Sequence, residues 1–528
     1  MKTKSILIIG IALLALSSCS DKFLERYPDG STLTANQYAE LDDILESSVR
    51  GIWSQFYLVS DHDLYGVRSI DLFTDMYSGD IAMKRCGYGW YQIDEEGETR
   101  SYRSSYLWSF YYNIIRLCNL GLNAVDAKGR PAHKAFPKAA DLTEADELEI
   151  ELTYYTAQLL AVRGYCYANM LKLFEEPDEA GTARDEKLVV PFYDESYTTT
   201  DALFGAPRAT VGELNIKIAD DLREAISYLD SIDSYVVRES KMEINSDVAK
   251  LILAYSQLNS ADYDEAFKYA KQVIDETSAN ILPHSQLFST GFADLKNNNW
   301  LWGKPVSIDN TGGLASFFGQ FDIHTYSYAY AGDVKTIDDA LYKEIQAQTW
   351  DDRVNWFRKD AQYDLVGDRK FYSPGYENTT DAESIDRDWT NDDVWMRLEL
   401  AYLVAAEAAA YRTNPSIDTA VLYLDAIMSE RVIEGEEAAY QTYKSSLNAA
   451  NIKDALVYNW RVEMWGEGYS LQTLRRLQGT RKLGSNHMSR ASEELKASSY
   501  ALTFAIPTSE ARYNPYLLDV ENLAEADY

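Results

Sequence analysis

Two long stretches of the chain repeat apolar residues at helical spacing, and they limit the fold more than any other feature. Residues 105–276 and 391–480 contain several segments in which apolar side chains recur every three or four positions, a pattern typical of amphipathic helices. A shorter segment of this kind covers residues 36–58. Residues 60–104 and 277–390 lack sustained periodicity and are rich in Gly, Asp and aromatic residues. We therefore expect a mainly α-helical protein with two irregular insertions.

Several helical segments come in pairs. Residues 251–275 place small residues such as Ala254 and Ala266 where the two helices of a tetratricopeptide pair approach each other. Residues 395–432 repeat this arrangement, and residues 141–174 predict one long helix with an acidic start. No strict period of about 34 residues runs through the chain. Degenerate repeats separated by insertions and unrelated helical hairpins are both compatible with the pattern.

The N-terminus has the layout of a bacterial export signal. Two lysines, an apolar run over residues 6–16 and two serines precede Cys19. The run is too short to span about 30 Å of hydrocarbon as a helix, and this order of segments is typical of a signal peptide. "LSSC" resembles the lipobox of bacterial lipoproteins, in which the cysteine receives lipid. We expect residues 1–18 to be the signal peptide, 19–35 a lipidated tether and 36–528 the folded domain.

Charge and composition exclude several functional classes. A formal net charge of −33 argues against a nucleic-acid partner, since phosphate backbones require neutralisation by Lys and Arg. The four cysteines and five histidines are scattered without CxxC or HExxH spacing, so neither a disulfide framework nor a transition-metal site is expected. The acid-rich residues 386–393 do not have the spacing of an EF-hand, and a solvated loop is favoured over a calcium site. No cofactor is expected.

Six segments spread along nearly the whole chain stand out: "CSDKFLERYP" (19–28), "LWSFYYNIIRLCN" (107–119), "AQLLAVRGYCYANMLKLFEEP" (157–177), "RATVGELNIKIADDLREAISYL" (208–229), "WRVEMWGEGYSLQTLRR" (460–476) and "FAIPTSEARYNP" (504–515). Together and in this order they resemble the SusD/RagB family of surface nutrient-binding lipoproteins of Bacteroidetes. Two departures occur: "LFEEP" lacks the usual glycine, and Glu399 stands one place before the usual acid.

This resemblance implies a SusD-like fold, in which about four tetratricopeptide-like helix pairs form a scaffold for an irregular, loop-rich ligand-binding half. It implies a non-enzymatic protein that is held on the outer membrane by lipid on Cys19 and faces the extracellular side. The implied partner is a SusC-like TonB-dependent transporter that takes up the bound nutrient. Glycans are the commonest ligands of the family, and RagB-type members take peptides instead.

Ligand-binding residues are expected in the two irregular insertions. A sugar ring has one apolar face and a rim of hydroxyls, so its site combines exposed aromatic rings with polar side chains. The candidates are Asp75, Tyr77, Asp80, Tyr88, Trp90, Tyr91, Asn299, Trp300, Trp302 and Tyr326. Alternating aromatics such as Trp300 and Trp302 also fit strands that pack inward, so core packing stays open for each of them. Scaffold roles are expected for Trp108, Trp395, Trp465, Arg163, Arg461 and Glu463.

Catalysis is the weaker hypothesis. The sequence contains no GxSxG, no phosphate-binding GxxxxGK[ST] and no GxGxxG after a strand. Glycosidases need two carboxylates at a defined separation across a cleft, and with 83 acidic residues carboxylate pairs in the sequence carry no information. A glycan-binding protein is therefore favoured over a peptide-binding protein, and a glycan-active enzyme is the remote alternative.

Overall fold

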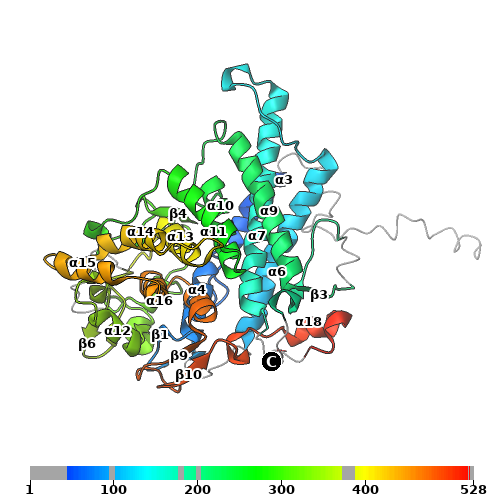
Figure 1. Cartoon of the computed structure of the whole chain (residues 1–528). Coiled ribbons are helices and arrows are strands. Elements are labelled where there is room, and N and C mark those ends of the chain that lie inside the picture. Colours follow the sequence, from blue (N-terminus) through cyan, green and yellow to red (C-terminus); the bar gives the residue numbers. More distant parts are fainter. Residues whose placement is uncertain are drawn as a thin grey trace, which may run out of the picture.

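A computed structural model of the chain (Figure 1) describes residues 44–93, 101–176, 183–197, 204–371, 387–520 and 523. The expected signal peptide, the tether and Cys19 lie outside the described residues. The scaffold is a row of α-helices in which each helix packs against the next along the chain. Its members are α6 (Tyr102–Lys128), α7 (Glu144–Phe174), α9 (Val211–Ile232), α10 (Ser246–Asn259), α11 (Tyr263–Glu276), α13 (Leu398–Tyr411), α14 (Ile417–Met428) and α16 (Ile452–Glu463).

Local sequence signals explain where these helices begin and how closely they pack. A capping box joins Thr143 and Asp146 at the start of α7, where the side chains satisfy backbone N–H groups that no helical carbonyl reaches. A Cβ at Gly164 of α7 would lie 2.8 Å from the Leu222 side chain of α9, so the glycine permits the close helix crossing. Ala254 and Ala266 are fully buried between α10 and α11. The predictions of a mainly α fold and of paired helices are confirmed.

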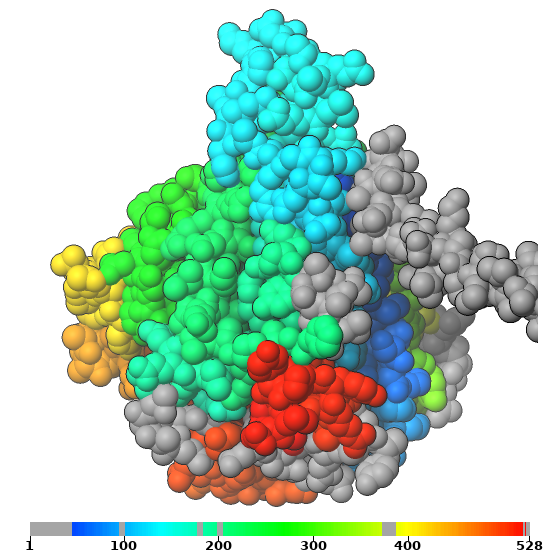
Figure 2. Space-filling model, turned by 90° about the vertical axis from the view of Figure 1, so that its right-hand side faces the viewer, coloured from blue at the N-terminus to red at the C-terminus, as the bar shows by residue number. Residues whose placement is uncertain are grey.

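The remaining described elements surround this row. The connection between α6 and α7 projects from the body (cyan in Figures 1 and 2), and α18 lies at the opposite end (red). The other helices are α3 (Ile44–Gln55), α4 (Val67–Tyr77), α12 (Asp339–Gln346), α15 (Glu437–Ser446), α17 (Ser470–Thr473) and α18 (Thr508–Tyr513). The strands are β1 (Ile81–Ala82), β2 (Leu188–Pro191), β3 (Arg208–Thr210), β4 (Trp300–Lys304), β5 (Thr336–Ile337), β6 (Arg358–Asp360), β7 (Asp364–Val366), β8 (Asp393–Arg397), β9 (Thr480–Lys482) and β10 (Glu494–Lys496).

One small sheet positions the irregular insertions relative to each other. Its strand order is β1-β5-β7-β6, and β1 pairs antiparallel with β5 through Ile81 opposite Ile337. The loop that leaves β1, residues 83–92, and the loop that enters β5, residues 324–335, therefore lie side by side. Residues more than 230 positions apart in the sequence thus form one surface.

The structure corrects three details of the sequence analysis. Residues 60–104 contain the helix α4, whose residues are all buried except Asp71, so no polar face reveals its periodicity. Trp395 lies on strand β8 and not on a helix. Apolar residues keep helical spacing over residues 451–477, but the helix stops at Glu463, because Gly466 and Gly468 have positive φ angles of 77° and 82° and form a turn.

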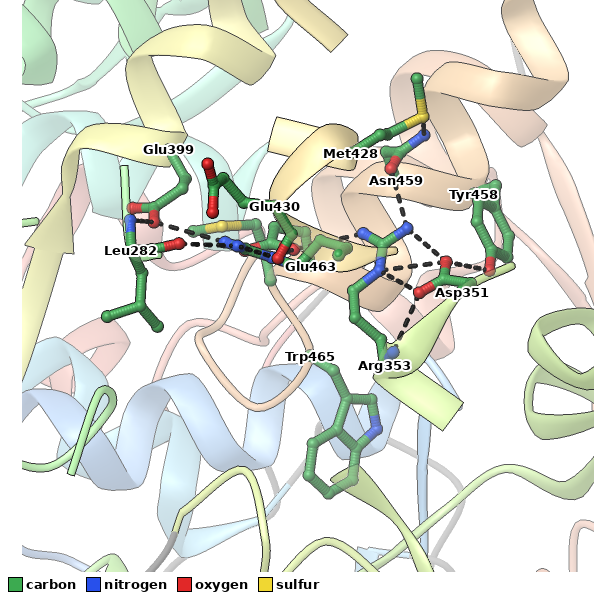
Figure 3. Close-up of polar contacts among 12 residues, drawn as sticks. Leu282, Asp351, Arg353, Glu399, Met428, Glu430, Tyr458, Asn459, Glu463 and Trp465 are labelled. Carbon is green, nitrogen blue, oxygen red and sulfur yellow. Dashed lines mark hydrogen bonds and ion pairs between the residues drawn. The ribbon is translucent and has the colours of Figure 1, made fainter. Parts of the chain in front are cut away.

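A buried charge network holds the irregular half against the scaffold (Figure 3). Glu463 at the end of α16 accepts hydrogen bonds from Arg397, Arg431 and Arg353, at 2.8 to 3.2 Å. Burial alone would raise the pKa of Glu463, but the guanidinium groups lower it well below its usual value. Counting the further partners, the network comprises Asp351, Arg353, Lys370, Arg397, Glu399, Arg431, Glu463 and Glu467.

The charged residues expected to be structural are confirmed as such. Arg163 of α7 forms a bidentate pair with Asp221 of α9, with both N···O distances at 2.7 Å. Arg461 donates two hydrogen bonds to Asp80, at 2.6 and 2.9 Å. Each of these arginines is at least 96% buried. Both pairs join elements that are distant in the sequence, and this is the role of a scaffold contact.

Candidate ligand-binding site

A cluster of aromatic rings lies where the 83–92 and 324–335 loops meet, and we call His62, Tyr88, Trp90, Tyr326 and Tyr328 the aromatic cluster. The ring of His62 stacks on Trp90 with centroids 4.8 Å apart and an interplanar angle of 23°. Tyr328 stands nearly perpendicular to both His62 and Tyr88, at 5.6 and 5.9 Å. Three separate segments therefore contribute rings to one patch.

Much of this patch faces solvent. Tyr88 is 53% exposed and Tyr326 is 50% exposed. His62 is also exposed, while Trp90 is half-buried. Rigid rings with both an apolar face and a polar edge bind sugars with little loss of conformational entropy. The exposed rings therefore provide a platform for an amphipathic ligand.

Polar groups surround the rings. The Tyr328 hydroxyl is hydrogen-bonded to Nδ1 of His62, which leaves Nε2 as the other polar atom of the exposed imidazole. Burial raises the pKa of Tyr328 to about 12, and Asp61 adds to the shift. Arg85 is exposed and donates to the carbonyl of Ala331 at 3.2 Å. A sugar that lies on the rings would find both hydrogen-bond donors and hydrogen-bond acceptors near its hydroxyl groups.

The structure brings together three of the ten predicted ligand residues, Tyr88, Trp90 and Tyr326. The other seven are buried and no more than 2% exposed: Asp75, Tyr77, Asp80, Tyr91, Asn299, Trp300 and Trp302. A ligand can touch a side chain only where some of its surface is exposed.

The two buried aspartates hold the turn after α16. Asp75 accepts hydrogen bonds from the backbone N–H groups of Gly466, Gly468 and Ser470, at 2.9 to 3.1 Å. The backbone carbonyl of Asp80 accepts a hydrogen bond from the Trp465 indole at 2.9 Å. These contacts account for both aspartates as parts of the fold.

The buried aromatics also have partners within the protein. The indole N–H groups of Trp300 and Trp302 donate to the carbonyls of Gly291 and Met242, at 2.7 and 2.8 Å. Tyr91 donates to the hydroxyl of Tyr65 at 2.6 Å. The Tyr77 ring packs edge-on against Phe504. Asn299 is 1% exposed, and its amide has no hydrogen-bond partner among the described residues.

Two members of the cluster, His62 and Tyr328, are not among the ten predicted ligand residues. Tyr328 belongs to the same aromatic-rich segment as Tyr326, so the composition of that segment could have identified it as a ligand candidate. His62 carried no such signal, because it lies 26 positions before Tyr88 in a stretch without other exposed rings. Its role depends on the tertiary contact with Trp90.

A larger cleft lies elsewhere, with a volume of about 940 Å³. Trp389 and a set of charged residues line it, but several of those side chains already have partners. Both carboxylate oxygens of Asp392 accept backbone N–H groups, and Lys241 donates to the carbonyls of Leu295 and Asn297. The Arg387 guanidinium lies 4.1 Å from the centre of the Trp389 ring. The aromatic cluster therefore offers more free ring surface than this cleft.

The described residues contain neither a metal-binding group nor a helix that could span a membrane. Within them, no group of three or more His, Cys, Asp or Glu side chains is arranged to hold a metal ion. In the same part of the chain, no helix combines the length and the apolar character needed to cross a membrane.

Comparison with known proteins identifies the fold. A structure of a SusD-like carbohydrate-binding protein from Bacteroides vulgatus superimposes with a TM-score of 0.69 and 19% identity, over 92% of this chain and 98% of that one. This chain has the SusD-like fold. A SusD-superfamily protein from Bacteroides vulgatus (TM-score 0.68, 20% identity, 89% and 96% covered) and one from Bacteroides thetaiotaomicron (0.65, 17%, 90% and 98%) agree.

Sequence comparison adds one SusD-like relative. A SusD-like protein of Bacteroides ovatus is 27% identical over 150 residues, a match that spans 28% of this chain and only 25% of that relative. No protein-family model matches the chain. The SusD-like resemblance predicted from the six sequence segments is thus confirmed. The superimposed structures show that the shared fold covers about nine-tenths of the chain.

Proposed function

We propose that this SusD-like chain is a cell-surface lipoprotein of the outer membrane that binds a glycan and delivers it to a SusC-like TonB-dependent transporter. The observation that carries the proposal is the aromatic cluster, in which exposed rings from distant segments meet beside polar groups. This combination suits the two chemical surfaces of a sugar. The carbohydrate-binding protein from Bacteroides vulgatus with the same fold supports a glycan over other ligands.

The anchor and the partner rest on the sequence. Cys19 follows a lipobox-like "LSS", and lipid there would hold residues 36–528 at the membrane surface through the tether of residues 19–35. Two or three acyl chains anchor a protein stably, whereas one anchors it only marginally. A protein fastened outside the membrane cannot import its ligand alone, and this supports a transporter as its partner.

The proposed activity is binding without catalysis. Two carboxylates act on Tyr328 from nearby, those of Asp61 and Asp333. Asp333 is fully buried and accepts two backbone N–H groups, so it cannot face a ligand. Glycoside hydrolysis usually needs two carboxylates about 5–10 Å apart across the scissile bond. We therefore expect the ligand to leave the protein unchanged.

The first test is affinity electrophoresis in gels that contain starch, xylan, arabinogalactan, polygalacturonate or chondroitin sulfate. Wild-type protein should be retarded by at least one of these polysaccharides, and Tyr88→Ala should restore most of the mobility. The matched control is Tyr516→Ala, because Tyr516 is 60% exposed and comes from the C-terminal segment outside the cluster. Reducing ends measured after overnight incubation should not increase.

Three outcomes would contradict the proposal. A rise in reducing ends would indicate an enzyme. Retardation that Tyr516→Ala removes and Tyr88→Ala preserves would mean that the ligand binds elsewhere. Binding of casein-derived peptides, with no effect of any polysaccharide in the panel, would favour the RagB-like peptide-binding alternative.

A further inference from the structure

The exposed rings of the 83–92 loop depend on a buried carboxylate of the neighbouring loop. Asp333 is fully buried. Its Oδ1 accepts a hydrogen bond from the backbone N–H of Gly87 at 2.5 Å, and its Oδ2 accepts one from the N–H of Tyr88 at 3.0 Å. One side chain thus holds two consecutive peptide groups of a loop that lies about 245 positions earlier in the sequence.

Side-chain contacts hold the residues next to this point: Arg85 donates to the Ala331 carbonyl and the Cys86 thiol donates to the Trp90 carbonyl, both at 3.2 Å. The backbone N–H groups of Gly87 and Tyr88 are held by Asp333. Lys84, Arg85, Gly87 and Tyr88 are exposed, so apolar burial does not order them. Gly89 has a φ of 81°, which is conformational freedom typical of glycine. Hydrogen bonds to a charged acceptor are stronger than those between neutral groups. The two hydrogen bonds to the Asp333 carboxylate therefore fix the peptide groups of Gly87 and Tyr88.

Contacts within its own loop hold the backbone of Asp333. Lys335 is buried, and its ammonium group donates to the Gln320 side chain at 2.7 Å and to the Asp333 carbonyl at 2.8 Å. The same ammonium lies 4.5 Å from the centre of the Tyr91 ring. The Asp333 N–H donates to the Tyr328 carbonyl at 2.9 Å. The Tyr88 side and the Tyr328 side of the cluster are thus joined through Asp333.

We propose that Asp333 is the positioning residue of the ligand site, which sets the orientation of Tyr88 toward Tyr328 without touching the ligand. This inference rests on the proposed function at the aromatic cluster. A loop without the carboxylate would leave Tyr88 free to sample many orientations, and binding would have to order it. Affinity would then fall although every ligand-contacting side chain is still present.

The test measures the Kd for whichever polysaccharide of the panel retards the wild type most strongly. Asp333→Asn keeps the shape of the side chain, but its amide oxygen can accept only one of the two N–H groups and its amide nitrogen faces the other. We expect the Kd to rise about tenfold, since one charge-assisted hydrogen bond is lost. Asp392→Asn is the matched control, because Asp392 also accepts two backbone N–H groups, from Leu295 and Val306, at 2.9 and 2.8 Å.

A second variant, Gly87→Ala, perturbs the contact between Asp333 and the 83–92 loop by a change in the loop itself. A Cβ at Gly87 would lie 3.1 Å from the Asp333 carboxylate oxygen, so Gly87→Ala should push the two groups apart and weaken binding by a smaller factor. Gly87 is exposed and its φ is not positive, so this variant should fold. Hydrogen exchange of the peptide that covers residues 84–92 should be faster in both variants than in Asp392→Asn.

The double variant separates positioning from a general loss of stability. If Asp333 acts through Tyr88, Asp333→Asn should add almost nothing to the Kd of Tyr88→Ala, because neighbouring effects of this kind are not additive. Equal factors in both backgrounds, or an unchanged Kd in Asp333→Asn, would overturn the proposal. If Tyr88→Ala itself binds as the wild type does, the proposed site fails, and the role of Asp333 fails with it.

Discussion

Replacing Glu463 by Gln tests whether the buried charge network holds the two halves of the molecule together. Glu463 accepts four hydrogen bonds from three arginines. No side chain of the network is more than 3% exposed. The four carboxylates balance four cations, and Glu463→Gln leaves three carboxylates against four cations. Its amide nitrogen would also face guanidinium donors.

The expected loss of stability follows from this geometry. Removing one partner of a buried ion pair costs about 3–5 kcal/mol, because the remaining charge is left uncompensated. An unfolding entropy of about 2.1 cal/mol/K per residue gives about 1 kcal/mol/K for a chain of 528 residues. We therefore expect Glu463→Gln to lower the Tm by about 3–5 °C.

Differential scanning calorimetry at pH 7 and one fixed scan rate measures this shift. The matched control is Glu46→Gln, because Glu46 pairs with Arg50 on the surface of α3, where the two side chains are 42% and 76% exposed. Such a pair contributes at most about 1 kcal/mol, so the control should melt within about 1 °C of the wild type. If Glu463→Gln melts within about 1 °C of the control, the buried network does not hold the two halves together.

Three further predictions concern stability and anchoring. Burial would raise the pKa of Glu195, but Arg163 and Arg130 lower it from 4.5 to about 2. The stability that the ionised side chain contributes is therefore complete above pH 4.5 and is lost as the pH falls towards 2. The Tm difference between wild type and Glu195→Gln should shrink over this range, and a constant difference would contradict the prediction. Gly466→Ala should destabilise the folded protein by more than about 1 kcal/mol, since φ is 77° and a Cβ would lie 2.7 Å from Phe371. Gly51→Ala lies in open space on α3 and should stabilise the protein by up to about 1 kcal/mol. Urea unfolding measures both changes. Cells that express the protein should incorporate labelled palmitate into it, and persistence of the label in Cys19→Ser would disprove lipidation at that residue.

Much of the scaffold was predictable because its helices carry local signals. The helix expected over residues 141–174 is α7, Glu144–Phe174, with its acidic first turn and its capping box at Thr143. The turn inside residues 451–477 was not predictable from periodicity, because the apolar spacing continues across it. What ends the helix is the pair of glycines at positive φ together with Asp75, which comes from a distant helix.

The candidate site was predictable only in part, for a similar reason. Composition indicated the two loops that meet at the aromatic cluster, and Tyr88, Trp90 and Tyr326 lie in that cluster. Alternation could not tell an exposed ring from a buried one, and Trp300 and Trp302 are core residues of β4. The contact of His62 with Trp90 depends on tertiary packing between separate loops, which periodicity and composition do not encode.

The most direct test of the central claim compares two half-buried tryptophans by titration calorimetry with the polysaccharide that binds wild type. Trp90 belongs to the aromatic cluster, and Trp389 lines the larger cleft. A ligand that covers about 60 Å² of ring contributes about 1.5 kcal/mol, which is about tenfold in Kd. We expect Trp90→Ala to raise the Kd about tenfold and Trp389→Ala to leave it unchanged. The opposite result, with both variants folded, would contradict the claim that the ligand binds at the aromatic cluster.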